Sequence, residues 1–297
     1  MTVVYLNGDL IDRSEAAISI DDRGFLFGDA VYEALRARRG RMFEAERHLA
    51  RLRHGLRELR LGEPGLTDGI LDAAATLIEL NGLSDAEALI YVQVSRGAAP
   101  RRHGFPPPGT RPTVFIQASP LVARTELCTG GAVAITHPDQ RWERCDLKTT
   151  NLLANCLANQ AAQDAGAYEA ILVRGGLVTE GTHCNVFGAV GGVLRTHPLT
   201  NRILRGVTRD VVIELARDAG WVVRQDALRL DELRYAEEIF LTGTTTDVMP
   251  IVRLDGAPVG GGRPGPVAAA LRDALDARMT SAPAGSLPTP SPPAGRK

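Results

Sequence analysis

Alternating apolar and polar positions open the chain and predict two β-hairpins. The segment Val3 to Leu6 is followed by Asn7-Gly8, a pair that accepts the positive φ angles of a tight turn. Val31 to Ala37 and Arg41 to Phe43 flank Arg39-Gly40 in the same way. We therefore expect the N-terminal region to contain short antiparallel strands.

Apolar positions then switch to helical spacing. The leucines from Leu49 to Leu59 recur at intervals of three, four and three residues, which predicts an amphipathic helix. A second helix is predicted from a Thr67 cap to Gly82, followed by strands at 88–95 and 113–118. The stretch between these strands, 97–112, is rich in Pro, Gly and Arg and indicates a functional loop.

The periodicity is lost around residues 119–130, where we place a domain linker at 121–129. This predicts an N-terminal α+β domain at 1–120 and a C-terminal β-rich domain with helices at 130–281. The Ser/Pro/Ala-rich stretch 282–297 is predicted to be a disordered tail. Predicted helices of the second domain cover 151–166, 207–220 and 266–279, and predicted strands cover 131–136, 168–174 and 184–190 and lie near Val222, Ile239 and Val248.

Charge and cysteine content limit the expected partners. Basic and acidic side chains nearly cancel, 34 against 35, so no overall field favours nucleic acid or an anionic membrane surface. No apolar run approaches the roughly 20 residues that span a bilayer, and the start does not resemble a signal peptide. The four cysteines lack metal-ligand spacing, so neither zinc nor a disulfide is expected. We expect a soluble cytoplasmic protein that acts on small molecules.

The basic residues are almost all arginine, because only Lys148 and Lys297 are lysines. An arginine keeps its proton at workable pH, whereas a lysine amine can lose its proton and attack a carbonyl to form an imine. Lys297 ends the predicted tail, which leaves Lys148 as the candidate for such chemistry. On this count alone, the alternative that one lysine remained by chance stays open.

An imine-forming lysine of a phosphorylated cofactor needs an anion site nearby. Gly206-Val207-Thr208 precedes a predicted helix, so free backbone N–H groups and the positive end of the helix dipole converge there. Thr208 adds a hydroxyl, and Thr244 to Thr246 offer further hydroxyls after a predicted strand. The alternatives are an ordinary capped helix start and a plain turn.

A carboxylate and a basic triplet complete the candidate site. Glu180 follows a Gly-Gly turn at a strand edge, where it could hold the pyridine nitrogen of a cofactor protonated; a solvated turn glutamate is the alternative. If Pro100 keeps the chain extended, Arg101 and His103 share a face and form a trap for a substrate carboxylate. A solvated arginine-rich loop is the alternative for this pair.

The pair His183 and Cys184 suggests a nucleophile and its base. Adjacent residues of a strand point to opposite faces, however, so the two side chains are not expected to meet.

Five ordered blocks carry a resemblance to a known family. They are DRGFLFGDAVYEA from Asp22, VSRGAAPRRHGFP from Val94, RWERCDLKTTNLL from Arg141, YEAILVRGGLVTEGTHCNVFG from Tyr168 and ILRGVTRDVV from Ile203. To about Gly256, the chain resembles the D-amino-acid transaminases, which are fold-type IV pyridoxal-phosphate enzymes. This resemblance implies an α+β fold with an N-terminal α/β sandwich, a C-terminal pseudo-barrel and a site at the domain cleft.

The resemblance also implies roles for single residues. Lys148 would hold pyridoxal 5′-phosphate as a Schiff base and shuttle protons, and Glu180 would contact the pyridine nitrogen. A homodimer is implied, with the trap loop contributed by the neighbouring subunit. The other implied site residues are Arg51, Leu204, Val207, Thr208 and Thr244 at the cofactor and Tyr32, Arg101 and His103 at the substrate carboxylate.

Some positions depart from the family pattern. Gly243 stands where a serine is usual, and Thr182-His183-Cys184 replaces a serine-rich stretch. Branched-chain L-amino-acid transaminases, R-selective amine transaminases and aminodeoxychorismate lyases share the lysine and the glutamate, so they remain alternatives. Only the Arg101-x-His103 trap favours D-amino acids, and the choice among D-alanine, D-glutamate and bulkier substrates stays open. The trap residues argue against a cofactor-binding protein without turnover.

Overall fold

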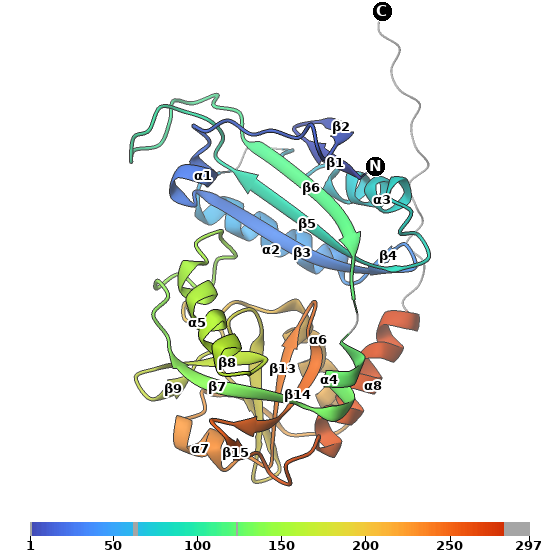
Figure 1. Cartoon of the computed structure of the whole chain (residues 1–297), viewed down its shortest axis with the longest axis vertical. Helices are drawn as coiled ribbons and strands as arrows, with labels where there is room; N and C mark the ends of the chain where they lie inside the picture. Colours follow the sequence, from blue (N-terminus) through green and yellow to red (C-terminus); the bar gives the residue numbers. More distant parts are fainter. Residues whose placement is uncertain (1, 62–64, 123, 282–297) are drawn as a thin grey trace, which may run out of the picture.

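The computed structural model describes residues 2–61, 65–122 and 124–281. The predicted tail at 282–297, which includes Lys297, lies outside these residues. The chain forms two β-sheets, and Figure 1 shows them stacked along the long axis of the molecule. The strands up to Pro120 make one sheet, and those from Ala132 onward make the other. The prediction of mixed α and β structure is confirmed.

The first sheet has six antiparallel strands in the order β2-β1-β6-β5-β3-β4. Helices α2 (Ala45–Glu58) and α3 (Ile70–Leu80) pack their apolar sides against it. The predicted leucine face is confirmed, because Leu49, Leu52 and Leu56 are buried in this core. The strands are β1 (Val3–Leu6), β2 (Asp9–Asp12), β3 (Ala30–Arg38), β4 (Arg41–Met42), β5 (Glu87–Ser95) and β6 (Thr113–Pro120).

The second sheet has nine strands in the order β12-β11-β10-β13-β14-β7-β8-β9, with β15 paired to β14. It is mixed, because β7 runs parallel to both β8 and β14 and β11 runs parallel to β12. The strands are β7 (Ala132–Pro138), β8 (Glu169–Arg174), β9 (Leu177–Val178), β10 (Asn185–Val190), β11 (Val193–Thr196), β12 (Val223–Gln225), β13 (Glu238–Gly243), β14 (Asp247–Leu254) and β15 (Ala257–Pro258).

Helices cover the second sheet from more than one side (Figure 1). Helices α6 (Val207–Asp218) and α8 (Pro266–Ser281) share an apolar core with β13, where Val211 and Leu271 pack near Phe240. Helix α5 (Leu153–Asp164) packs on β7 and β8 through small residues such as Ala158. The sequence predicted these three long helices, but not the short helices α1 (Arg23–Phe27), α4 (Thr125–Gly130) and α7 (Leu230–Arg234).

Two local predictions were wrong. Helix α3 is not capped by Thr67, because it begins at Ile70 after Gly69, whose φ of 74° is left-handed. The Thr67 hydroxyl instead accepts a hydrogen bond of 2.9 Å from Nε of Arg53. The stretch 119–130 is also less irregular than expected, since β6 continues to Pro120 and α4 begins at Thr125.

Ion pairs join the two halves of the molecule. Arg36 on β3 contacts both Glu87 on β5 and Asp247 at the start of β14. Arg47 Nη1 on α2 lies 2.8 Å from Glu214 Oε1 on α6. These contacts fix the cleft between the two sheets, where most of the predicted site residues lie. Over residues 2–61, 65–122 and 124–281, no helix is long and apolar enough to cross a membrane.

Candidate active site

A cavity between the two halves gathers most of the predicted site residues. Including its open mouth, it measures about 740 Å³. The first half contributes Tyr32 from β3 and Arg51 from α2, and the second half supplies the rest of the wall. Eight of the ten predicted site residues line it: Tyr32, Arg51, Lys148, Glu180, Leu204, Val207, Thr208 and Thr244.

Lys148 reaches this cavity from the segment that joins β7 to α5. The backbone N–H of Tyr32 donates to the carbonyl of Lys148 at 2.9 Å, and Val31 forms an isolated β-bridge with Thr149. Strand β3 thereby fixes the backbone on both sides of the lysine. Lys148 Nζ lies 4.3 Å from the centroid of the Tyr32 ring, so the amine faces the aromatic wall of the cavity.

Glu180 is almost fully buried on another wall and is hydrogen-bonded on both oxygens. Its carboxylate accepts from the Arg141 guanidinium, from Asn185 Nδ2 at 3.0 Å and from the Leu204 N–H at 3.0 Å. Burial raises the pKa of Glu180 to about 7, and the positive charge of Arg141 opposes this shift. Arg141 is therefore what favours the ionised carboxylate at this depth.

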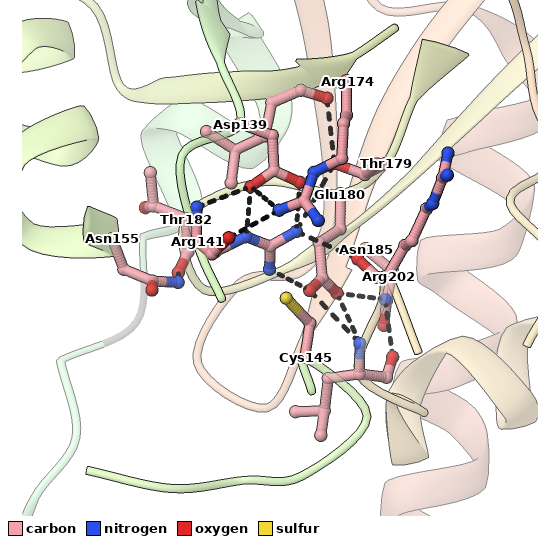
Figure 2. Close-up of polar contacts among 12 residues, drawn as sticks. Asp139, Arg141, Cys145, Asn155, Arg174, Thr179, Glu180, Thr182, Asn185 and Arg202 are labelled. Atoms are coloured by element: carbon pink, nitrogen blue, oxygen red, sulfur yellow. Dashed lines mark hydrogen bonds and ion pairs between the residues drawn. The ribbon is translucent and has the colours of Figure 1, made fainter. Parts of the chain in front are cut away.

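Arg141 belongs to a buried ionic network that Figure 2 shows around Glu180. Arg141 Nε lies 2.9 Å from Asp139 Oδ1, and Arg174 lies 3.0 Å from the same oxygen. Although burial acts to raise it, hydrogen bonds from Arg141 and Thr179 hold the pKa of Asp139 at about 2. Asp139 stays charged at neutral pH and keeps Arg141 directed at Glu180.

The start of helix α6 forms a cradle for an anion. Its N-cap, Gly206, has no side-chain hydrogen bond, so the first N–H groups of the helix remain unoccupied by a cap. A Cβ added to Gly206 would lie 2.0 Å from Asn185 Oδ1, so a larger residue would displace the Asn185 side chain, which donates to Glu180. The hydroxyls of Thr208 and Thr244 line the same cavity. Within the described residues, the buried Thr242 hydroxyl has no hydrogen-bond partner.

Arg51 enters the cavity from α2 and is held from behind. Its Nε and Nη2 donate to Glu33 at 2.9 and 2.7 Å, and its Nη1 donates to the carbonyl of Arg205 at 2.7 Å. Glu33 is itself buried and also contacts His48 Nδ1 at 3.0 Å. The guanidinium is thus fixed beside the α6 cradle.

Arg101 and His103 do not reach the cavity of their own chain. Both are exposed in the loop between β5 and β6, which projects away from the sheets in Figure 1. Both pack on Phe27, with the Arg101 guanidinium 5.2 Å and the His103 ring 5.7 Å from its centroid. Arg23 donates to the carbonyl of Arg102 at 2.6 Å and so fixes the backbone between them.

Several residues of the site were missed from the sequence. Arg141, Asp139 and Asn185 surround Glu180, and Glu33 holds Arg51. Arg141 lies within one of the five sequence blocks, but nothing in its spacing separates it from the many other arginines. Asp139 and Glu33 act only through contacts between distant segments, for which the sequence gives no local signal.

Comparisons with known proteins agree with this arrangement. Residues 30–254 match the family described as amino-transferase class IV. The D-alanine aminotransferase of Bacillus licheniformis is 40% identical over 278 residues, covering 94% of this chain and 97% of the relative. The branched-chain amino acid aminotransferase of Escherichia coli superposes with a TM-score of 0.88 at 28% identity, with 94% of each chain covered.

A further solved structure is a hypothetical aminotransferase from Mycobacterium tuberculosis in a PLP-bound form. It superposes with a TM-score of 0.82 at 27% identity, covering 94% of this chain and 99% of the other. The predicted two-domain α+β fold of fold type IV and the prediction of an aminotransferase are confirmed by these matches. The chain belongs to the amino-transferase class IV family.

Proposed function

We propose that this protein is a pyridoxal 5′-phosphate-dependent aminotransferase that moves amino groups between D-amino acids and 2-oxo acids. The observation that carries the proposal is the cavity that brings Lys148 together with Glu180 and the α6 cradle. The D-alanine aminotransferase of Bacillus licheniformis is 40% identical to this chain, and this likeness supports the D-amino-acid class.

The cavity fits pyridoxal 5′-phosphate at both of its charged ends. Arg51 and the uncapped start of α6 at Val207 and Thr208 would hold the phosphate. Glu180 would face the pyridine nitrogen, with the N–H of Leu204 and the guanidinium of Arg141 fixing its carboxylate. When bound, the cofactor supplies an electron sink for the pair left behind when the substrate Cα loses its proton.

Lys148 has two roles in this proposal. Its amine is the covalent attachment point for the cofactor, because it is the one lysine among the residues that the structure describes. Lys148 Nζ would also take the proton from the substrate Cα and later return one. The contact with the Tyr32 ring keeps the amine within the cavity between these steps.

We propose that Tyr32, together with Arg101 and His103 of a second subunit, binds the substrate carboxylate. The loop that carries Arg101 and His103 projects from its own chain, where it cannot reach the cavity. Exposed apolar side chains support a homodimer: Phe25 on α1 is 70% exposed, and Leu153 and Leu157 on α5 are 75% and 60% exposed. Helices α1 and α5 lie on the same side of the molecule in Figure 1.

The proposal includes a small-molecule metabolite partner and a cytoplasmic location. The four cysteines are free in the structure, which suits a reducing compartment.

We also propose domain boundaries at 1–120 and 130–281 with a linker at 121–129, because each of the two sheets is built from one of these segments.

Transamination of branched-chain L-amino acids is the second candidate function. It is supported by the Escherichia coli branched-chain amino acid aminotransferase, which superposes on this chain with a TM-score of 0.88. A spectral assay of the purified holoenzyme separates the two. We expect D-alanine to remove the visible absorbance of the bound cofactor, whereas L-leucine leaves it. A band that responds only to L-leucine would replace the D-amino-acid proposal with the branched-chain one.

A further inference from the structure

We propose that His183 binds the distal carboxylate of a dicarboxylic substrate and so makes the enzyme favour D-amino acids with an acidic side chain over D-alanine. The inference rests on the proposed transamination of D-amino acids and extends it to the substrate side chain. His183 lies two residues before the start of β10 and lines the cavity that holds Lys148. Its side chain is 44% exposed.

One side of the imidazole is fixed by a buried acid. His183 Nδ1 lies 2.9 Å from Oε2 of Glu169 on β8, and the Glu169 side chain is fully buried. Although burial acts to raise it, hydrogen bonds from His183 and Thr182 hold the pKa of Glu169 below its ordinary value. His183 Nδ1 also lies 3.1 Å from the Thr182 hydroxyl. An ionised carboxylate only accepts, so a hydrogen bond between His183 and Glu169 requires the proton on Nδ1.

Because Nδ1 is engaged, Nε2 lies on the side of the ring that faces away from Glu169. Within the described residues, no hydrogen bond to His183 Nε2 is present. The turn that carries the ring is itself fixed, since Asn155 Nδ2 donates to the carbonyl of Thr182 at 2.7 Å and Asn159 Nδ2 to its hydroxyl at 3.2 Å. With a proton on Nδ1, Nε2 donates to a carboxylate only in the imidazolium form of the ring, in which both nitrogens are donors. The imidazolium is therefore the form of His183 that would bind a substrate carboxylate at the cavity wall.

The other charged groups of the cavity are already committed. Arg51 is held by Glu33 beside the phosphate cradle, and Arg141 is held by Asp139 against Glu180. Lys148 is the attachment point for the cofactor. His183 is the remaining nitrogen base on the cavity wall, and no part of the cofactor needs it.

Arg124 does not line the cavity but contacts the Tyr168 ring, which neighbours His183. The Arg124 guanidinium lies 5.3 Å from the centroid of the Tyr168 ring, and this ring is 6.4 Å from that of His183 in an edge-on arrangement. Because the ionised Glu169 also lies against His183, the contact that would hold a substrate carboxylate is the one to the imidazole itself. A dicarboxylic substrate would be held at both ends, by the carboxylate trap and by His183, whereas D-alanine would use only the trap.

Two substitutions separate the two nitrogens of the imidazole. His183→Asn keeps an N–H donor near the position of Nδ1 and removes Nε2, whereas His183→Gln places its amide near the position of Nε2. The readout is the ratio of kcat/KM for D-glutamate with pyruvate to kcat/KM for D-alanine with 2-oxobutyrate, so effects shared by both donors cancel. We expect His183→Asn to lower this ratio about 10- to 100-fold, as for the loss of a charge-assisted hydrogen bond, and His183→Gln to lower it less.

The matched control is His54→Asn, because His54 is an exposed histidine of α2 that does not line this cavity. We expect this control to keep the wild-type ratio. A ratio within threefold of wild type in His183→Asn would overturn the inference.

Calorimetric titration of the holoenzyme with glutarate and with butyrate tests the same contact without turnover. We expect glutarate to bind more tightly than butyrate, and this difference to shrink at least about tenfold in His183→Asn. An unchanged difference would overturn the role of His183. If wild-type protein transaminates neither D-amino acid, the proposed function fails, while the titration still decides whether His183 binds the second carboxylate.

Discussion

Replacing Arg141 with methionine should lower the stability of the protein and favour the protonated form of Glu180. The substitution keeps an apolar stem of similar length and removes the guanidinium that contacts Glu180 and Asp139. Both carboxylates are buried, with side chains that are 6% and 0% exposed. Breaking a buried ion pair on one side costs about 3–5 kcal/mol, because the remaining charge has lost its partner.

A loss of this size should be visible in thermal unfolding. For a chain of this length, each kcal/mol shifts the melting temperature by about 2–4 °C, so Arg141→Met should melt about 6–20 °C below wild type. The assay is differential scanning calorimetry of cofactor-free protein at pH 7.5. Arg144→Met is the matched control, because its ion pairs with Glu58 and Asp146 are partly exposed to solvent, and it should shift the melting temperature by less than about 2 °C.

The same variant makes a prediction about pH. Burial raises the pKa of Glu180 and Arg141 opposes this, so removing Arg141 should raise the pKa further. A group with a raised pKa is neutral below that value, so Glu180 should be protonated at pH 7 in the variant and regain its charge as the pH rises. Cofactor affinity and activity should therefore recover partly between pH 7 and 9. A variant with the melting temperature and pH profile of wild type would refute the role given to Arg141.

Three further substitutions test the remaining parts of the site. Lys148→Ala should abolish the visible cofactor band and activity together, since no other described residue is a lysine, and retained turnover would remove Lys148 from its role. Glu180→Gln should keep the cofactor bound yet slow removal of the substrate Cα proton by orders of magnitude in stopped-flow measurements, and an unchanged rate would make Glu180 structural. Arg101→Leu should raise the KM for D-alanine at least about tenfold without changing the cofactor band, and a normal KM would exclude Arg101 from the carboxylate trap.

The sequence predicted those parts of the molecule whose signals are local. The leucines of α2 follow the helical period, and all but the last are buried as the period requires. Lys148 was found because a lysine is chemically distinct from the arginines that fill the rest of the chain. Glu180 and Gly206 were singled out from a turn and a helix start, and the structure places both at the cavity.

Other features depend on contacts between distant segments, so no local pattern predicts them. Asp139 and Glu33 act by holding Arg141 and Arg51, and these pairs form only after the chain has folded. The proposed Thr67 cap was wrong because Gly69 can take the left-handed backbone conformation and start the helix two residues later. The short helix α4 was missed because its six residues are too few to show a period.

The position of the predicted carboxylate trap cannot be understood from one chain alone. The sequence pointed to Arg101 and His103, and the structure places both on Phe27 in the loop between β5 and β6, outside the lining of the cavity of the same chain. One chain therefore gathers the residues predicted to bind the cofactor at its cavity, with Tyr32 as the only predicted trap residue there. The proposed homodimer would complete the substrate end.

The central claim is tested most directly by the handedness of the amino donor. If Tyr32 and the partner's trap fix the carboxylate, Lys148 reaches only one face of the substrate Cα, and the mirror-image amino acid must place its carboxylate in the side-chain pocket. An unpaired buried carboxylate costs several kcal/mol, so the account predicts that kcat/KM for D-alanine with 2-oxoglutarate exceeds that for L-alanine by at least about a thousandfold. Equal rates for the two enantiomers, or faster turnover of L-leucine than of D-alanine, would contradict it.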